Sequence, residues 1–411
     1  MGGEGAGGAF RRAETVSGEG ANRRVQALRF IVALGLVSLF ADMTYEGARA
    51  IIGPYLQTLG ASGFEMGLVV GLGEMCAASL RYWSGRMADR TRAYWAIAIC
   101  GYTVNLLAVP MLAFAGNWLW AGALVVAERT GKALRGPSRD VLLSEATAEV
   151  GHGWGFGLHT AMDQTGAVLG PLWVALAVAR AHGFRQAFLP LALPAVAALA
   201  ALLGAKKMRA GHARPQPASD NRAVEFPKVY WKYSIAAGLL AFGYLDFPFF
   251  AYYWVRHGLF ANAVIPLLYA AAMGGEGLVG LAMGRMFDRW GVRMLSWATL
   301  VSLLALPLGF LGTAAAAAGA IACWAVGTGA QSACLRAGIA GVVSMNNRGR
   351  AFGTFHAIWG MSWFAGTALL GWLLDRNLVA MVAIGMLAQA AAAGLFLQLR
   401  AQLVPDQPVR S

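Results

Sequence analysis

The chain has 411 residues, of which 58% are hydrophobic and only 13% are charged, and its mean hydropathy is +0.55. A soluble protein carries about 25% charged residues, and a single core cannot bury this much apolar side chain. Many apolar runs approach or exceed the roughly 20 residues that cross a bilayer as a helix. The composition therefore excludes a soluble protein and predicts an all-α membrane protein rather than a β-barrel.

The net charge of +13 is distributed unevenly along the chain. Lysine and arginine gather in alternate loops, at 11–29, 86–92, 132–139, 206–232, 285–293, 336–350 and 400–410. The intervening loops hold few basic residues: Arg180, Arg185, Arg256 and Arg376. Basic loops of membrane proteins face the cytoplasm. The pattern predicts a multi-pass protein of the plasma membrane (the bacterial inner membrane) with both termini cytoplasmic. Its expected partner is the lipid bilayer and not nucleic acid.

The apolar runs fall into two sets. Residues 1–27 are rich in Gly, Glu and Arg and are expected to form a disordered cytoplasmic tail. The basic, proline-containing segment 205–229 predicts a cytoplasmic linker between two halves, 28–204 and 230–400, and 401–411 form a second tail. The expected spans are about 28–58, 63–84, 94–115, 118–135, 155–179 and 186–204, then 230–255, 262–283, 294–312, 314–335, 351–374 and 378–400.

One polar stretch between apolar runs occurs twice, as Gly85–Arg92 and as Gly284–Gly291, and we interpret each copy as a tight loop. Its carboxylates, Asp89 and Asp288, are 199 positions apart (288 − 89). Arg135 and Arg336, which end two runs, are 201 positions apart (336 − 135). A nearly constant offset of half the chain predicts two six-helix bundles related by a pseudo-twofold axis along the membrane normal.

These repeated stretches resemble the cytoplasmic signature of the major facilitator superfamily, Gly-x-Leu-x-Asp-Arg-x-Gly-Arg, and the resemblance covers the chain from residue 28 onward. The first copy matches at Gly85, Asp89 and Arg90 but has Arg92 and Ala93 in place of the final Gly and Arg. The second copy keeps Gly284, Asp288, Arg289 and Gly291. The resemblance implies twelve spans, a central cavity and alternating access to the two sides of the membrane.

A second motif resembles the exporting branches of that family. Gly166, Gly170 and Pro171 match Gly-x-x-x-Gly-Pro, although Val174-Ala175 replaces its terminal Gly-Gly. Small residues four apart let two helices approach closely, and a proline permits a bend, so ordinary helix packing is an alternative explanation. Arg129 lies roughly where drug/proton exporters carry a buried arginine linked to proton coupling, although the spacing of its flanking glycines departs from theirs.

Several charged residues lie inside the apolar runs, where each costs about 2.5–3.5 kcal/mol on insertion scales unless water reaches it. Asp42, Glu46 and Arg49 share one helix face near the middle of the first run. We expect them to line the cavity, with a local Glu46–Arg49 pair as the alternative. Asp246 lies 200 positions after Glu46 (246 − 46) and is expected to face the cavity as well. It precedes Phe247-Pro248, so a role at a break in the helix is the alternative.

Four further charges are candidates for the substrate or proton site. Glu74 and Glu276 lie in glycine-rich second helices of the two halves. Each is either a cavity residue or a structural carboxylate, with Arg129 as a partner for Glu74. Glu128 and Arg129 are adjacent and point about 100° apart, so they are not expected to pair simply with each other.

The cytoplasmic gate is assigned to the two repeated stretches, together with Arg135 and Arg336. Contacts made by Asp89–Arg90 and Asp288–Arg289 are expected to favour the state that is open to the outside. Asp163 is either a coupling carboxylate or a partner of Arg135 in this gate, and the sequence leaves both open.

The functional prediction is a secondary transporter that exports a small molecule in exchange for protons. A proton-driven importer of a small cationic or zwitterionic solute is the alternative. An enzyme is not expected, because no HExxH, GxSxG or matched ligand set occurs. The four cysteines lie inside apolar runs without a CxxC pair, so no metal, disulfide or cofactor is predicted. The sequence carries no signal for oligomeric state.

Overall fold

The computed structural model describes residues 5–181, 183–208, 226–343 and 348–399 and is helical throughout its regular elements. The first half contains α1 (Gly5–Thr58), α2 (Gly63–Thr91), α3 (Tyr94–Met111), α4 (Trp118–Val150), α5 (His152–Ala181) and α6 (Ala192–Met208). The second half contains α7 (Lys228–Gly243), α8 (Phe247–Arg256), α9 (Val264–Trp290), α10 (Arg293–Ser302), α11 (Ala305–Phe310), α12 (Ala314–Val342), α13 (Arg348–Leu374) and α14 (Leu378–Gln398). Short 3₁₀ helices, Leu112–Phe114 and Gln186–Leu191, precede α4 and α6.

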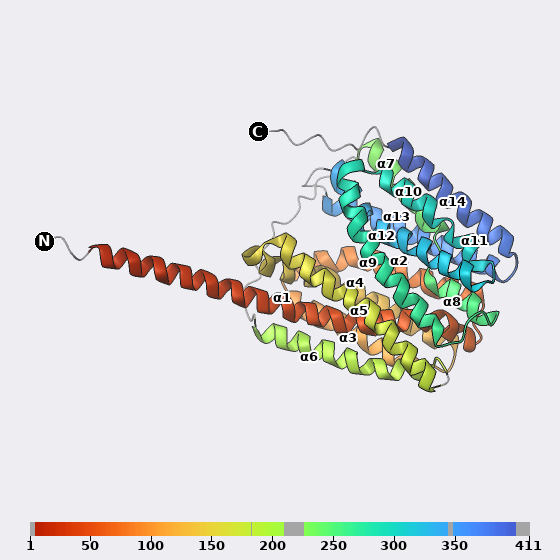
Figure 1. Ribbon diagram of the computed structural model, residues 1–411, viewed down its shortest axis with the longest axis horizontal. Helices are drawn as coiled ribbons and strands as arrows, with labels where there is room; N and C mark the ends of the chain where they lie inside the picture. The colour runs from red at the N-terminus through yellow and green to blue at the C-terminus, as the bar shows by residue number, and fades with distance from the viewer. Residues whose placement is uncertain (1–4, 182, 209–225, 344–347, 400–411) are drawn as a thin grey trace.

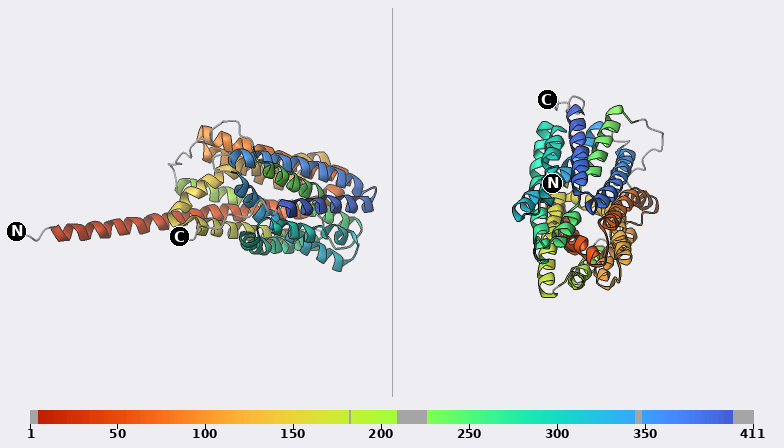
Figure 2. Two further views of the ribbon diagram at one scale, coloured as in Figure 1. Left: turned by 90° about the horizontal axis from the view of Figure 1, so that it is seen from above. Right: turned by 90° about the vertical axis from the view of Figure 1, so that its right-hand side faces the viewer.

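The helices run roughly along one common axis, and the two halves lie side by side (Figure 1). The end-on view of Figure 2 shows α1–α6 on one side and the second half on the other. The halves meet where α2 packs on α13, where α5 packs on α9, and where α1 packs on α8. Residues far apart in the sequence therefore share three seams between the halves.

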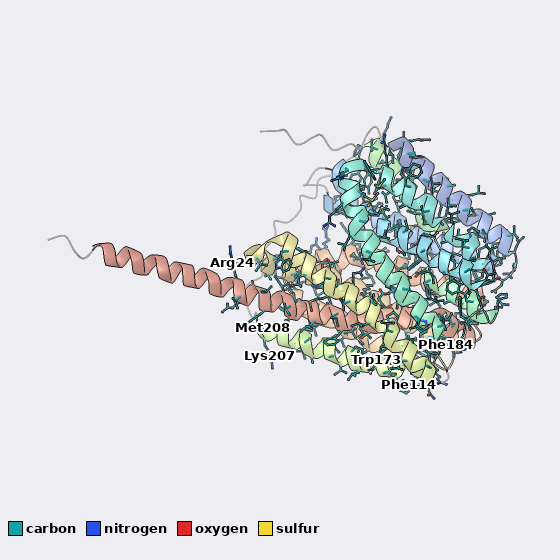
Figure 3. The ribbon with its side chains drawn as sticks, in the orientation of Figure 1. Arg24, Phe114, Trp173, Phe184, Lys207 and Met208 are labelled. Carbon is teal, nitrogen blue, oxygen red and sulfur yellow. The ribbon has the colours of Figure 1, made fainter. Side chains whose placement is uncertain are left out.

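Ten segments in the described ranges are long and apolar enough to cross a membrane. Four of them combine two neighbouring elements, for example α7 with α8 over Lys228–Arg256. α4 is not among the ten, since its first 18 positions carry Glu128, Arg129, Lys132 and Arg135. Figure 3 places Arg24 and Lys207 at one end of the first half and Phe114 and Phe184 at the other. These ends are called the basic end and the outer end below.

Several helices are longer than expected. α1 begins at Gly5, so the segment expected to be a disordered tail is helical and projects from the bundle (Figure 1). Extension of an existing helix adds one hydrogen bond per residue, so a polar segment can continue a helix that an apolar segment begins. A search for apolar patterns does not detect such an extension. α4 continues past Pro137 to Val150, where a polar stretch was expected, since the basic face of this helix lies along a wet cavity.

The repeated polar stretches are also helical and not loops, which corrects their interpretation from the sequence. α2 runs through the first copy to Thr91, and α9 runs through the second copy to Trp290. Each helix ends on a residue of positive φ, Arg92 at 55° and Gly291 at 59°. Arg92 has the left-handed αL conformation, which stops a helix by turning the chain away from its axis, and Gly291 leaves α9 with a positive φ that glycine adopts without strain. The turns therefore follow the motif instead of containing it.

The expected break in the first helix of the second half is present. α7 ends at Gly243, and the Asp246 carboxylate accepts a 2.8 Å hydrogen bond from the Phe247 N–H at the start of α8. Pro248 follows in the first turn, where its missing N–H costs no helix hydrogen bond. The break thus has a sequence-encoded cap, and it fixes the position of one buried carboxylate.

Two glycines of the exporter-like motif hold α5 against α1. A Cβ on Gly166 would lie 2.2 Å from the Leu39 carbonyl oxygen, and a Cβ on Gly170 would lie 2.3 Å from that of Met43. Only glycine allows backbone contact this close. Gly166 and Gly170 therefore fix the distance between α5 and the charged segment of α1.

A methyl group at Gly170 is expected to force these helices apart. Gly170→Ala should lower the stability of the purified protein by about 1–3 kcal/mol, the usual cost of overpacking a tight contact. The measurement is the midpoint of thermal unfolding in detergent. Gly157→Ala on the same helix is the matched control, since nothing lies within 4 Å of its Cβ position. Equal midpoints for the two variants would contradict the packing role of Gly170.

Candidate functional site

A cavity of about 620 Å³ lies between the two halves. We call it the central cavity. Its lining comprises Asp42, Tyr45, Glu46, Arg49, Arg81, Lys132, Arg135, Gly136, Pro137, Arg139, Asp140, Thr160, Asp163, Gln164, Ala167, Met273, Glu276, Trp324, Thr328, Gln331, Ser332, Phe352 and His356. The lining is rich in charge, with five acidic and five basic side chains among these residues. Such a concentration of charge inside an apolar bundle is tolerated where water enters.

Asp42 of α1 lies in the wall of this cavity with only 6% of its surface exposed. Its carboxylate accepts a hydrogen bond from the Tyr45 hydroxyl. Among the described residues no basic side chain forms an ion pair with it. The charged groups that act on it electrostatically are Asp163, Lys132 and Arg135. A buried carboxylate without a direct cationic partner is readily neutralised by a proton.

Glu46, one turn further along α1, is fully engaged. Its carboxylate lies 3.6 Å from the Lys132 Nζ of α4 and accepts a 2.5 Å hydrogen bond from the Tyr269 hydroxyl of α9. This second contact crosses between the halves. Tyr269 and Lys132 were not identified as site residues from the sequence, because a buried tyrosine and a lysine at the expected end of a span are common packing and interfacial residues.

Arg49 joins the two halves at the base of the cavity. Its Nη2 lies 2.6 Å from Oδ2 of Asp246, which is 1% exposed, and its Nη1 lies 3.9 Å from Oε1 of Glu46. The sequence left two alternatives for these residues, a cavity-lining group and a local Glu46–Arg49 pair. The structure contains both, since the pair exists within a cavity-lining cluster. Arg49 lies between the two carboxylates, and Asp246 is not among the residues that line the cavity, since it caps α8 at the helix break.

A second charged cluster lies behind the cavity wall, and the lining does not include it. Arg129 Nη1 lies 3.2 Å from Glu74 on α2, which agrees with the structural alternative for that carboxylate. Arg129 Nε also lies 3.3 Å from Glu128, so these neighbours do pair, but not simply with each other, because Arg129 contacts α2 as well. The long arginine side chain folds back across the 100° between them. Asn105 donates a 2.8 Å hydrogen bond to Glu128, and Gly73 leaves room for the Arg129 stem.

Asp163 lies nearer the basic end of the cavity and contacts a different arginine from the one expected. Its carboxylate is 3.9 Å from Arg139 and 3.5 Å from His159 Nδ1, whose Nε2 is 3.0 Å from the Ser38 hydroxyl. Arg139 falls on the unexpected extension of α4, which is why the sequence did not suggest it.

Arg135 has a separate environment. It is 1% exposed, and its guanidinium lies 4.2 Å from the centre of the Tyr102 ring and 5.5 Å from that of Tyr45. Within the described ranges its Nε and Nη1 have no hydrogen-bond partner. Its charge is therefore held by aromatic faces at the wall of the central cavity.

The remaining residues assigned to the gate lie at the basic end. The Arg90 and Arg289 side chains are exposed, Gly85 packs near Pro137, and nothing lies within 4 Å of a Cβ at Gly284. The side chains of Asp89, Asp288 and Arg336 lie outside the described part of the structure. Their gate role stays a prediction.

The outer end of the bundle is closed by contacts that the sequence did not indicate. Asp375, just after α13, pairs with Arg256 of α8 and accepts a 2.5 Å hydrogen bond from the Gly63 N–H at the start of α2. Nearby, Gly53 of α1 lies directly against the Pro248 carbonyl. In the sequence Asp375 looks like an ordinary turn residue between two spans. The central cavity extends toward the basic end, where Arg81 of α2 and Arg139 and Asp140 of α4 line it.

A helical membrane bundle with a charged cavity between two halves, sealed at one end, has the architecture of a transporter. The sequence model of the Major Facilitator Superfamily matches residues 34–367, and the chain belongs to this family. It is therefore a multi-pass membrane protein that carries out secondary transport of small molecules and is not an enzyme.

Relatives and solved structures agree with this assignment. An uncharacterized protein of Mycobacterium tuberculosis (strain ATCC 25618 / H37Rv) is 38% identical over 371 residues, covering 88% of this chain and 90% of the relative. An uncharacterized transporter of the same superfamily from Methanocaldococcus jannaschii is 31% identical over 137 residues, covering 33% of this chain and 34% of the relative.

Two solved structures share the fold. A peptide transporter of the POT type in complex with sulfate has a TM-score of 0.72 at 13% identity, covering 92% of this chain and 96% of that one. A bacterial homolog of the human lysosomal transporter Spinster, in an inward-facing and unoccupied conformation, has a TM-score of 0.63 at 12% identity, covering 92% of this chain and 96% of that one.

The Arg49–Asp246 pair gives a test of the link between the halves. Arg49→Gln leaves a buried carboxylate without its cation and should cost about 3 kcal/mol of stability. Asp246→Asn in the same protein removes that charge while keeping a capping oxygen for α8, so the double variant should be more stable than Arg49→Gln alone. Thermal unfolding of both variants and of Asp246→Asn alone measures the coupling.

Arg180→Gln, at an exposed arginine on the outer end of α5, is the control for loss of a positive charge. If the Arg49→Gln/Asp246→Asn double variant is no more stable than Arg49→Gln, the ion pair does not stabilise the contact between the halves.

Proposed function

We propose that the protein is a proton-coupled exporter of the bacterial inner membrane, with both termini in the cytoplasm. The observation that carries the proposal is Asp42, a carboxylate buried in the cavity wall with no ion pair to any described residue. The positive-inside distribution of lysine and arginine supports the orientation. In that orientation the central cavity opens to the cytoplasm.

We assign twelve spans to the chain, with α4 and α12 added to the ten apolar segments. The two six-helix bundles comprise residues 28–204 and 230–400, joined by the cytoplasmic linker 205–229. The offset of 199 residues between the repeated motifs supports their relation by a pseudo-twofold axis. Rocking of one bundle against the other then exposes the central cavity to each side in turn.

Asp42 acts as the proton carrier in this proposal. When the carboxylate is protonated, it is neutral and the wall of the cavity loses one negative charge. When it is ionised, the Tyr45 hydroxyl donates to it, and Lys132 and Arg135 stabilise the charge electrostatically. Exchange follows if substrate and proton use the same carboxylates in turn, since each can then bind only after the other has left.

Coupling to helix movement runs through α5. Gly166 and Gly170 hold α5 against the backbone of α1 at Leu39 and Met43, and Asp163 lies one turn before Gly166 on α5. A change of charge at Asp42 therefore acts on two helices that move together. The likeness of Gly166–Pro171 to the motif of exporting branches supports export as the direction.

The cytoplasmic gate is assigned to the outward-open state, in which it is closed. In the open-inward arrangement Arg90 and Arg289 are exposed. We assign Asp89, Arg90, Asp288 and Arg289, with Arg135 and Arg336, to contacts that form when the cytoplasmic side shuts. Opening of the outer side then requires the Arg49–Asp246 and Glu46–Tyr269 contacts to separate.

Proton coupling can be tested before a substrate is known. Spin labels at Met87→Cys and Trp290→Cys, in a protein whose native cysteines are replaced, report the separation of the exposed ends of α2 and α9. The distribution of distances should change between acidic and alkaline pH. Asp42→Asn should abolish that change because the side chain at position 42 is then neutral at every pH.

Asp140→Asn is the control, because this carboxylate also lines the cavity but is 55% exposed and paired with Arg139. It should leave the pH response intact. A response in Asp42→Asn equal to that of the unmodified protein would rule out Asp42 as the proton carrier.

The direction of transport requires the substrate. A thermal-shift screen of the purified protein against a broad compound panel should identify binders, since a ligand that binds only the folded state stabilises it. In cells that express the protein, an exported binder should fall below its level in cells without it, and Asp42→Asn should restore that level. Accumulation in the expressing cells would instead establish the proton-driven importer.

A further inference from the structure

A second cavity, of about 850 Å³, lies along the seam between α5 and α9. We call it the α5–α9 groove. It is lined by α5 from Gly157 to Leu169 and by α9 from Met273 to Leu281, mainly with apolar side chains and glycine. No step of the proposed exchange uses it. Its position between the halves makes it a candidate route to the central cavity.

The groove adjoins the central cavity. Thr160, Gln164, Met273, Glu276 and Ser332 line both. One side of this shared wall is apolar, and the other carries the charged residues of α1 and α4. A ligand that occupies both spaces must therefore have an apolar part and a polar part.

The apolar side of the groove faces the lipid. Leu278 and Leu281 on its rim are 72% and 65% exposed, and Leu169 is 41% exposed. Exposed leucines on a membrane-spanning helix contact acyl chains. Gly157 and Leu169 are 12 positions apart, or about 18 Å along the helix, close to the roughly 15 Å of hydrocarbon in one leaflet. The groove thus follows the leaflet on the basic side of the bundle.

The opposite seam between the halves is sealed. A Cβ on Gly67 of α2 would lie 2.3 Å from the Thr367 carbonyl of α13, and a Cβ on Gly371 would lie 2.3 Å from that of Gly63. On the α5–α9 seam, a Cβ on Gly274 would meet only Val168, at 3.9 Å, and the tight contact at Gly277 is to the Gln164 side chain, at 2.9 Å, and not to backbone. An inward-open arrangement by itself does not explain why one seam is closed backbone to backbone while the other holds a cavity.

The polar group at the junction is acidic. Glu276 lies where the two cavities join and accepts a 2.9 Å hydrogen bond from the Ser332 hydroxyl. No ion pair to a basic residue is formed by Glu276 within the part of the chain that the structure describes. A carboxylate in this position attracts a cationic group that enters from the groove.

We propose that the substrate is a lipid-like amphiphile with an ammonium-bearing headgroup, which reaches the central cavity sideways from the cytoplasmic leaflet through the α5–α9 groove. The apolar chain stays in the groove and the bilayer, while the head contacts Glu276. This inference rests on the proposed transport function, and it names the chemical class of the cargo and its route.

The test uses three photoactivatable probes with the same diazirine-bearing alkyl chain and different heads: phosphocholine, trimethylammonium and sulfate. The full-length protein in lipid nanodiscs is irradiated with each probe, and the cross-linked positions are mapped by mass spectrometry. Both ammonium-bearing probes should label 157–169 and 273–281, and the sulfate probe should label these segments about tenfold less. Glu276→Gln should reduce labelling by the two ammonium-bearing probes toward the level of the sulfate probe.

Gly274→Leu fills the groove and should reduce labelling there about tenfold for every probe, since a leucine side chain occupies the space next to Val168. Gly204→Leu on α6 is the matched control, because nothing lies within 4 Å of its Cβ position, and it should label like the unmodified protein. Equal labelling of all membrane-facing helices, or no effect of Gly274→Leu, would overturn the route. Stronger labelling by the sulfate probe would overturn the ammonium head.

These outcomes are separate from those for proton coupling. Cross-linking requires neither a proton gradient nor a direction of transport. Groove labelling that survives in a protein without a pH response at Asp42 would overturn only the coupling. A pH response without groove labelling would overturn only the lateral route.

Discussion

The architecture depends on the requirement that charge inside a membrane be paired or hydrated. Arg49 meets this requirement by contacting Asp246 of the other half at 2.6 Å and Glu46 of its own helix at 3.9 Å. A buried ion pair of this kind contributes little net stability, but the loss of one partner is costly. The pair therefore specifies which surfaces of the two halves meet. It also leaves Asp42, on the same face of α1, as the carboxylate without a fixed cation.

The arrangement of the charges follows from close backbone packing. Gly166 and Gly170 let α5 lie on the carbonyl groups of Leu39 and Met43, so the charged face of α1 is turned toward the cavity at a fixed depth. Gly73 performs a related role for the Arg129 cluster. Glycine in this chain thus determines where side chains of other residues can be placed, which explains why glycines accompany the charged positions in the sequence.

Much of the fold and part of the site could be predicted from the sequence. The helical class, the family, the break before Phe247 and the cavity positions of Asp42, Glu46 and Arg49 follow from hydropathy, motif and spacing. The partners do not, because pairing is decided by helix packing and by side-chain length. Arg129 reaches back to Glu128 although their directions diverge, Asp163 meets Arg139 on an extension of α4 that a polar composition concealed, and Asp375 resembles a turn residue until α2 is placed beside it.

Two of the three seams between the halves, α2–α13 and α5–α9, have different mechanical properties. Along α2 and α13, glycine brings the backbones into contact at several levels, from Gly63 beside Gly371 to Gly360 beside Met75. Helices in such contact can roll or slide past each other but cannot part without losing the packing of the whole seam. If the halves rock, α2 and α13 then act as a hinge, and the largest displacement falls on the far edge, where α5 faces α9. The α2–α13 edge would stay in contact while the α5–α9 edge widens and narrows. The surrounding lipid would therefore meet a changing protein surface at one edge and a constant surface at the other in every transport cycle.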